Sequence, residues 1–391
     1  MTAPISTKPR SIPPRIHVLA KPTGSTCNLN CAYCFYLKKN QLYPDSRFRM
    51  SDEVLESYVS QLIESHRADK VTVSWQGGEP TLMGVDFYRR AITFQEKYCR
   101  PGMTFENTLQ TNGTLLDEEW CEFLRKNEFL VGISIDGPAP LHDTHRVDKK
   151  GRPTFDQVMR GLRLLQKHGV EYNVLVTVNR INANDPLEVY RFLRDEAGTS
   201  WMQFIPAIER LNKEGVALYQ EGDTVSDRTV TPEQWGNFLI AIFDEWVRND
   251  VGKVFVQTFE AAVRNWLGPG SSGMCIFDPV CGHGLALEHN GDLYACDHFV
   301  EPKYLWGNIL ETHMMDLAGS PPQTKFGRDK LDTLPKFCRE CEVRFACHGE
   351  CPKNRFLATP DGEPGLNYLC AGYKSFFNHA DRSLKILAGL I

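Results

Sequence analysis

The chain has 391 residues, of which 42% are hydrophobic and 24% charged, and 44 Lys and Arg face 49 Asp and Glu. This composition is globular, and its slightly negative balance argues against a protein that binds nucleic acid by bulk charge. No apolar run reaches the roughly 18–20 residues of a membrane span. The N-terminus lacks the apolar core of a secretory signal, so we expect a cytoplasmic protein with neither nucleic acid nor membrane as partner.

Residues 1–15 are rich in proline and basic residues and predict a flexible arm. From 16 to 208, segments typical of strands and of helices alternate, which predicts a parallel sheet, either open or closed into a partial barrel. The predicted strands cover 16–22, 70–76, 105–111, 130–136, 172–178 and 200–208. The predicted helices cover 51–66, 85–98, 117–127, 154–169 and 185–198.

Three of the predicted strands end in polar or glycine-rich turns: QGGEP at 76–80, QTNG at 110–113 and SIDGP at 134–138. Active sites of parallel α/β folds gather at the carboxyl ends of the strands. The three turns therefore predict one rim that contacts a ligand, although each of them could simply connect a strand to a helix.

Residues 209–272 predict a connector, with a polar loop to about 230 and helices over 231–250 and 254–268. The segment GPGSSG precedes a cysteine-rich region, 273–372, and a C-terminal helix is expected over 373–391.

The thirteen cysteines are clustered, and an odd number cannot all pair in one chain. Cys27, Cys31 and Cys34 have C-x3-C-x2-C spacing directly after the first strand. Three thiolates from one loop can bind three irons of a 4Fe–4S cube and leave the fourth iron open. Zinc is the alternative metal, but it usually takes four ligands and no fourth is near. Cys99 and Cys121 lie on predicted helices and are expected to pack as apolar residues.

The loop CNLNCAYCF resembles the cluster loop of the radical S-adenosylmethionine (SAM) enzymes, and QGGEP resembles their GGEP motif. The resemblance covers roughly residues 16–210 and implies an α/β fold, a partial (β/α)6 barrel, in which the open iron binds SAM. It also implies that Glu79 and the backbone of Gly77 and Gly78 hold the methionyl amine.

The C-terminal cysteines resemble the SPASM domain, an iron–sulfur domain appended to some radical SAM enzymes. Eight thiolates are enough for two fully ligated 4Fe–4S clusters, which makes three clusters in all. The resemblance implies that one auxiliary cluster takes Cys275, Cys281, Cys296 and Cys351 and the other takes Cys338, Cys341, Cys347 and Cys370. Spacing alone does not reveal this division, and the C-x2-C pair also leaves a zinc ribbon open.

Nearly the whole chain resembles the anaerobic sulfatase-maturating enzymes, through CNLNCAYCFY, WQGGEPTLMG, LQTNGTLLD, LVGISIDGP, MQFIPAIE, HNGDLYACDHFV and LNYLCAGY. Members oxidise a Cys or Ser of a sulfatase precursor to Cα-formylglycine. The resemblance implies an unfolded precursor or its C/S-x-P-x-R segment as substrate, and an electron donor such as flavodoxin or ferredoxin. It implies SAM contacts at Tyr33, Gln76, Gly77, Gly78, Glu79, Gln110, Asn112, Ser134, Asp136, Arg146 and Ile208.

Asp297, next to Cys296, matches the proposed proton acceptor of that family. Its alternative is a turn residue near the cluster. One departure from the family pattern is CHGEC at 347–351, where Glu350 replaces a glycine.

Two other functions remain open at this point. Another SPASM-type maturase, which crosslinks a ribosomal peptide, would share every cysteine. A non-catalytic iron–sulfur or zinc protein is less consistent with the open three-cysteine loop and the GGEP motif.

Overall fold

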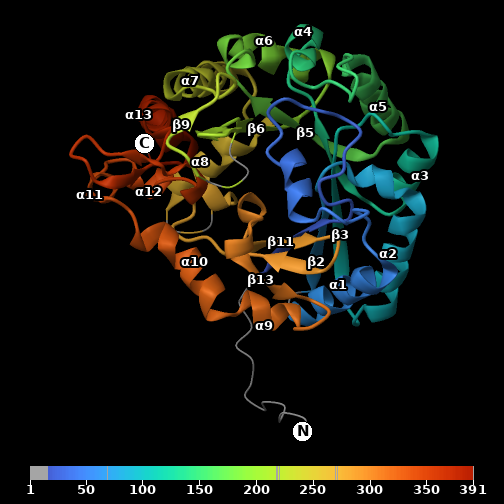
Figure 1. Cartoon of the computed structure of the whole chain (residues 1–391). Coiled ribbons are helices and arrows are strands. Elements are labelled where there is room, and N and C mark those ends of the chain that lie inside the picture. The colour runs from blue at the N-terminus through green and yellow to red at the C-terminus, as the bar shows by residue number, and fades with distance from the viewer. Residues whose placement is uncertain are drawn as a thin grey trace.

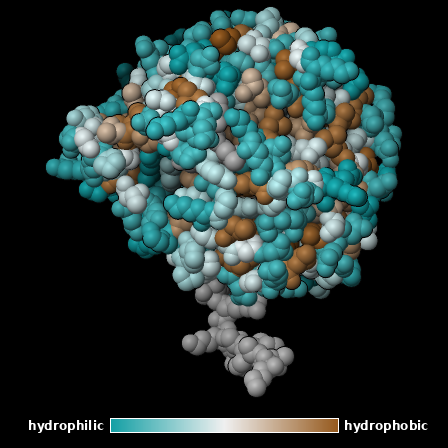
Figure 2. All heavy atoms as spheres, in the orientation of Figure 1, coloured by the Kyte–Doolittle hydropathy of each residue, from teal (hydrophilic) through white to brown (hydrophobic). Residues whose placement is uncertain are grey.

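The structure is a computed structural model that describes residues 16–67, 69–216, 219, 221–268, 270 and 272–390 (Figure 1). The expected flexible arm, 1–15, lies outside the described residues. Among the described residues no helix is both long and apolar enough to cross a membrane. The face in Figure 2 is mostly hydrophilic, with hydrophobic residues scattered between polar ones.

Six parallel strands form the predicted barrel wall in the order β6-β5-β4-β3-β2-β1. They are β1 (His17–Lys21), β2 (Lys70–Trp75), β3 (Thr104–Thr111), β4 (Leu130–Ser134), β5 (Glu171–Val178) and β6 (Trp201–Pro206). The helices between them are α1 (Asp52–Ser65), α2 (Val85–Tyr98), α3 (Glu118–Lys126), α5 (Phe155–His168) and α6 (Pro186–Arg191). The prediction of a partial (β/α)6 barrel is confirmed.

Local signals in the sequence set the helix ends. The Ser51 hydroxyl accepts a hydrogen bond from the backbone N–H of Val54 (3.2 Å) and so caps α1. Gly169 ends α5 in the left-handed conformation, with φ of 65°. Thr231 and Gln234 form a capping box at the start of α7 (Pro232–Asn249).

Three segments differ from the predicted elements. The expected loop after residue 208 contains a small antiparallel sheet of β7 (Arg210–Asn212), β8 (Gly215–Val216) and β9 (Thr224–Val225). The helix expected to 198 changes after α6 into a π-helical turn, η4 (Phe192–Glu196). The helix expected from 254 is a short strand, β10 (Phe255–Val256), followed by α8 (Gln257–Leu267).

The C-terminal region extends the barrel sheet. β11 (Gly284–Glu288) pairs in parallel with β1, and β12 (Asp292–Tyr294) and β13 (Leu305–Asn308) follow antiparallel. At the other edge β10 continues the sheet beside β6. Residues that follow β12 therefore lie next to the end of β1, although they are far away in the sequence.

The last helix, α13 (Cys370–Leu387), begins at a predicted cluster ligand and packs against α7. A Cβ on Gly236 would lie 2.9 Å from the Cα of Gly372, so these two glycines permit the close helix contact. Figure 1 shows this C-terminal part at one side of the barrel.

The remaining helices are η1 (Leu37–Leu42), η2 (Pro80–Met83), α4 (Ala139–Asp143), η3 (Asn182–Asn184), η5 (Cys275–Phe277), η6 (Asp297–Phe299), η7 (Pro302–Tyr304), α9 (Met314–Ala318), α10 (Pro321–Asp332), α11 (Lys336–Arg339), α12 (Arg344–Cys347) and η8 (Pro352–Asn354). The strands β14 (Leu357–Ala358) and β15 (Pro364–Leu366) form a separate pair.

Candidate active site

The first cysteine loop leaves the end of β1 and is held by the segment after α4. The backbone N–H of Asn30 donates to the carbonyl of Val147 (2.8 Å), and that of Ala32 donates to the carbonyl of His145 (3.0 Å). Cys27, Cys31 and Cys34 are free thiols. Burial is the main cause that raises the pKa of Cys27 to about 12. The charges of Cys31 and Cys34 are among the further causes. The structure thus brings the three predicted ligands together, with thiols that a metal charge would stabilise as thiolates.

The GGEP segment packs directly onto this loop. The N–H of Gly78 donates to the carbonyl of Gly24 (2.8 Å), and the N–H of Glu79 donates to that of Thr26 (2.8 Å). A Cβ on Gly78 would lie 2.0 Å from the Thr26 oxygen, so only glycine fits here. The glycines that were expected to admit the ligand therefore also admit the backbone of the cysteine loop.

Glu79 is fully buried and surrounded by donors from this chain. Its carboxylate accepts hydrogen bonds from the N–H (3.0 Å) and hydroxyl (2.6 Å) of Thr81, the hydroxyl of Thr111 (2.7 Å) and the N–H of Asn112 (2.8 Å). Burial raises the pKa of Glu79, and these hydrogen bonds oppose the shift. Three of these bonds go to Oε1 and one goes to Oε2, so Oε2 keeps room to accept a further hydrogen bond. The SAM contact of the Glu79 side chain stays a prediction.

The other predicted SAM contacts come from the carboxyl ends of β3 and β4, from the cysteine loop (Tyr33) and from the segment after α4 (Arg146). The Tyr33 hydroxyl donates to Asp136, whose carboxylate forms an ion pair with Arg146 at 3.0 Å. The Arg146 guanidinium lies 5.6 Å from the centre of the Tyr33 ring. Gln110 donates to the hydroxyl of Ser134 (3.2 Å). Asn112 lies 3.7 Å from the sulfur of Cys27.

Two of the predicted SAM contacts, Gln76 and Ile208, differ in character, one polar and one apolar. Within the described structure, the side-chain oxygen of Gln76 is buried without a hydrogen-bond donor. Such an oxygen suits the ammonium group of SAM, because a buried acceptor without a donor costs free energy. Ile208 lies in the main hydrophobic core, so the structure assigns it a packing role and leaves its contact to SAM a prediction.

Asp297 opens the short helix η6 after β12 and forms an ion pair with Lys21, the last residue of β1. Lys21 is 1% exposed, and its ammonium lies 4.0 Å from the centre of the Tyr36 ring. Burial is the largest single influence and would raise the pKa of Asp297. The charge and hydrogen bond of Lys21, together with the charges of His298 and Lys353, outweigh it and hold that pKa below its usual range. Asp297 is thus a partly buried, ionised carboxylate between the cysteine loop and the C-terminal region.

The eight C-terminal cysteines fall into two groups, and the thiols within each group are close enough to affect one another's pKa. In the first group, burial is the main cause that raises the pKa values of Cys281, Cys296 and Cys351. The nearby charge of Cys275 raises each of them further. The same kind of effect links Cys338, Cys341, Cys347 and Cys370. These four also line one small cavity. The grouping is the one that the resemblance implied, and the assignment of these cysteines as cluster ligands stays a prediction.

Among the described residues, no three His, Cys, Asp or Glu side chains converge as the ligands of a single metal ion do. A 4Fe–4S cube is bound differently, because each cysteine ligates a separate iron. All thirteen cysteines are free, and the donor sets consist of thiols. The cysteines present therefore fit iron–sulfur clusters.

The two isolated cysteines have different surroundings. Cys121 is buried on α3, as expected, whereas Cys99 is exposed just after the end of α2, so the expectation that it packs in the core is wrong.

Glu350, which replaces a glycine of the family pattern, has a backbone φ of +52°. This left-handed conformation explains why glycine suits the position. The Glu350 side chain is buried, and its carboxylate accepts hydrogen bonds from the amides of Asn354 (3.0 Å) and Asn367 (2.5 Å). These bonds offset the unfavourable backbone conformation.

We expect Glu350→Gly to be more stable than Glu350→Ala by about 1 kcal/mol, because both lose the carboxylate but only glycine relieves the positive φ. Anaerobic thermal unfolding of the two reconstituted variants measures the difference. Equal midpoints would show that the loop relaxes away from φ of +52° once the side chain is removed.

A cleft of about 630 Å³ opens beside η6. Phe299, Tyr304 and Phe326 pack edge to face along one side of it. Three carboxylates and two cations also line it: Glu221, Glu301, Asp329, Arg210 and Lys303. The cleft is large enough for several residues of an extended peptide and begins two residues after Asp297.

Comparison with known proteins identifies the two parts of the chain. Residues 22–193 match the Radical SAM superfamily, and residues 275–342 match the SPASM family, described as an iron–sulfur cluster-binding domain. The chain is 48% identical to the serine-type anaerobic sulfatase-maturating enzyme of Bacteroides thetaiotaomicron. The similarity covers 93% of this chain and 89% of the relative. This chain belongs to the anaerobic sulfatase-maturating enzymes.

Further relatives agree with this membership. The cysteine-type anaerobic sulfatase-maturating enzyme of Clostridium perfringens is 34% identical over 94% of this chain and 96% of its own. A solved structure described as native anSMEcpe with bound AdoMet and Cp18Cys peptide superimposes with a TM-score of 0.85. It is 32% identical and covers 97% of this chain and 100% of its own. The chain is therefore a radical SAM enzyme with an iron–sulfur SPASM domain.

Sequence reasoning missed Lys21, the partner of Asp297. One signal was available, because a lysine ends the otherwise apolar first strand immediately before the cysteine loop. A charged residue at that point of a buried strand needs a partner, but the sequence does not show that the partner comes from residue 297.

Proposed function

We propose that this enzyme oxidises a serine or cysteine side chain of a sulfatase precursor to Cα-formylglycine. The observation that carries the proposal is the similarity over nearly the whole chain to both serine-type and cysteine-type enzymes. The 48% identity to a serine-type enzyme leads us to propose that serine is accepted.

We propose three 4Fe–4S clusters, held by the N-terminal triad and the two C-terminal groups of four cysteines. When bound, the N-terminal cluster and SAM supply the one-electron chemistry that removes a hydrogen from the target Cβ. Gln76, Gln110, Asn112, Ser134, Asp136 and Arg146 would bind SAM, and the buried Tyr33–Asp136–Arg146 group keeps that pocket rigid.

Asp297 would accept the proton of the target hydroxyl or thiol. Lys21 keeps this carboxylate ionised and in place, since their ion pair is buried at the base of the cysteine loop. Cys296, a proposed ligand of an auxiliary cluster, is the neighbouring residue, so the base would lie beside the proposed acceptor of the remaining electron. A small acidic electron donor, flavodoxin or ferredoxin, would supply the first electron.

The cleft beside η6 would bind the substrate segment that follows the target residue. Its aromatic wall suits a proline, and Glu221, Glu301 and Asp329 suit an arginine, as in the C/S-x-P-x-R motif. An extended segment of four residues reaches about 13 Å, which is enough to pass from Asp297 into the cleft.

A peptide assay tests the function. The reduced, reconstituted enzyme is incubated with SAM and peptides that contain S-x-P-x-R or C-x-P-x-R, and the products are weighed and treated with an aldehyde-specific hydrazide. We expect both peptides to give a hydrazide-reactive aldehyde. The hydrazide is necessary because oxidation of serine and formation of a crosslink both remove a pair of hydrogens. A product of that mass without hydrazide reactivity would contradict formylglycine and support a crosslinking maturase.

A further inference from the structure

A basic surface is connected to the N-terminal cysteine loop of this slightly acidic chain. Residues 148–167 carry two carboxylates and six cations, and all six cations are exposed. We call these side chains the basic face: Lys149, Lys150, Arg152, Arg160, Arg163 and Lys167. Arg152 is paired with Asp148 and Lys167 with Glu118 of α3, so the excess of positive charge rests on the other four cations. In a chain with a net charge of −5, this local excess is a distinct feature.

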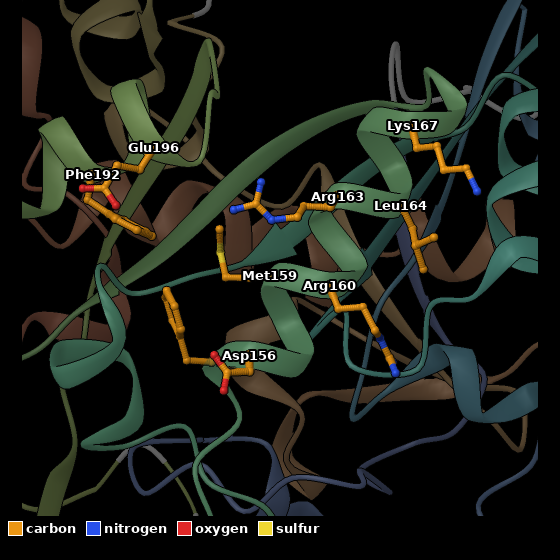
Figure 3. Close-up of a pocket in the computed structure, with 9 residues that line it drawn as sticks. Asp156, Met159, Arg160, Arg163, Leu164, Lys167, Phe192 and Glu196 are labelled. Atoms are coloured by element: carbon orange, nitrogen blue, oxygen red, sulfur yellow. The ribbon is translucent and has the colours of Figure 1, made fainter.

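An open groove of about 530 Å³ lies within the basic face, between α5 and η4. Figure 3 shows the Arg163 guanidinium extending from α5 into the space between the two helices. In the part of the chain that the structure describes, no hydrogen bond or ion pair joins Arg163. Phe155, Met159 and Phe192 supply apolar surface to the groove. Its charged lining is mixed, with the cations Arg160, Arg163 and Lys167 and the carboxylates Asp156 and Glu196. An apolar centre with a charged rim is the usual make-up of a protein–protein interface.

The backbone connects the basic face directly to the cysteine loop. Leu29 forms an antiparallel bridge with Asp148, and Asn30 donates to the carbonyl of Val147 (2.8 Å). Lys149 and Lys150 follow Asp148 at once. The basic face and the predicted cluster ligands therefore belong to one hydrogen-bonded unit.

Side chains make a second connection. Arg160 donates to the carbonyl of Thr114 (2.8 Å), and Asn28 donates to the Thr114 hydroxyl (2.8 Å). Asn112 donates to the side-chain oxygen of Asn28 (2.9 Å) and lies 3.7 Å from the Cys27 sulfur. A short series of hydrogen bonds thus runs from the groove to a predicted ligand of the N-terminal cluster.

We propose that the basic face is the docking surface of a small acidic protein that carries single electrons and reduces the N-terminal cluster. In the transfer, one electron leaves the reduced flavin of a flavodoxin and enters the cluster, and no atom moves with it. Complementary charge fits this partner, because transient redox complexes rely on electrostatic attraction for fast association. The proposal rests on the proposed function, since it requires a cluster at the cysteine loop.

Binding of reduced flavodoxin to the reconstituted enzyme, measured by anaerobic calorimetry at low and high salt, tests the docking surface. We expect wild-type affinity to fall as salt rises. The double variant Lys150→Glu/Arg163→Glu should bind roughly 10-fold more weakly or worse at low salt. The matched control is Arg248→Glu on α7, where the arginine side chain is 72% exposed and its nearest carboxylate, Asp244, is 3.9 Å away. This variant should bind like the wild type.

A stopped-flow measurement gives the second readout. The oxidation of reduced flavodoxin by the enzyme should slow in the double variant by a similar factor, while SAM cleavage driven by dithionite stays unchanged. Unchanged flavodoxin affinity in the double variant, or an equal loss in Arg248→Glu, would overturn the proposal. Loss of dithionite-driven cleavage would also overturn it, because the substitutions would then have damaged the cysteine loop. Intact flavodoxin binding without any aldehyde product would instead overturn the proposed function alone.

Discussion

Replacing Cys27, Cys31 and Cys34 together with alanine should lower the iron content from about 12 to about 8 per chain and abolish SAM cleavage. The reason is that these three thiols are the only predicted ligands of the cluster with an open iron, whereas the C-terminal groups have four thiols each. Iron and sulfide analysis after anaerobic reconstitution gives the content, and chromatography of 5′-deoxyadenosine gives the cleavage.

The exposed Cys99 provides the control for this experiment. Cys99→Ala should keep about 12 irons and full SAM cleavage. Stoichiometric zinc with only about 4 irons in the wild-type protein would contradict the two auxiliary clusters. SAM cleavage by the triple variant would contradict the assignment of the N-terminal triad.

Asp297→Asn should form formylglycine at least about 100-fold more slowly while it keeps its clusters and still cleaves SAM. Asparagine has nearly the same shape as aspartate, but it cannot accept the proton of the target and it leaves Lys21 without its counter-charge. The yields of aldehyde and of 5′-deoxyadenosine from the same reaction separate a proton-transfer defect from a loss of SAM binding.

Asp332→Asn, an exposed carboxylate on α10, is the control and should behave like the wild type. A near-wild-type aldehyde yield from Asp297→Asn with intact clusters would remove Asp297 from the mechanism. The next candidates for the base would then be His298, Glu350 and Tyr294. Of these, His298 is partly buried, and loss of solvent lowers its pKa to about 4, so it is neutral at physiological pH.

The sequence by itself determined the barrel and its ligand-rich rim. Alternating apolar and polar residues, together with caps such as Ser51 and Gly169, report local structure, because they depend only on near neighbours in the chain. The spacing of Cys27, Cys31 and Cys34 likewise indicates a cluster loop, since all three come from one short segment. The short strands after residue 208 escaped prediction because their polar sequence has the composition of a loop.

Only the tertiary structure decided which distant residues meet. The pairing of β11 with β1 brings Asp297 to Lys21, and no local pattern encodes this, because strand pairing depends on the whole sheet. The partners of Glu79 were likewise decided by packing. The motif assigned its carboxylate to SAM, and the structure surrounds that carboxylate with four donors from its own chain. Local periodicity shows which side chains are buried, whereas their partners follow from packing between segments far apart in the sequence.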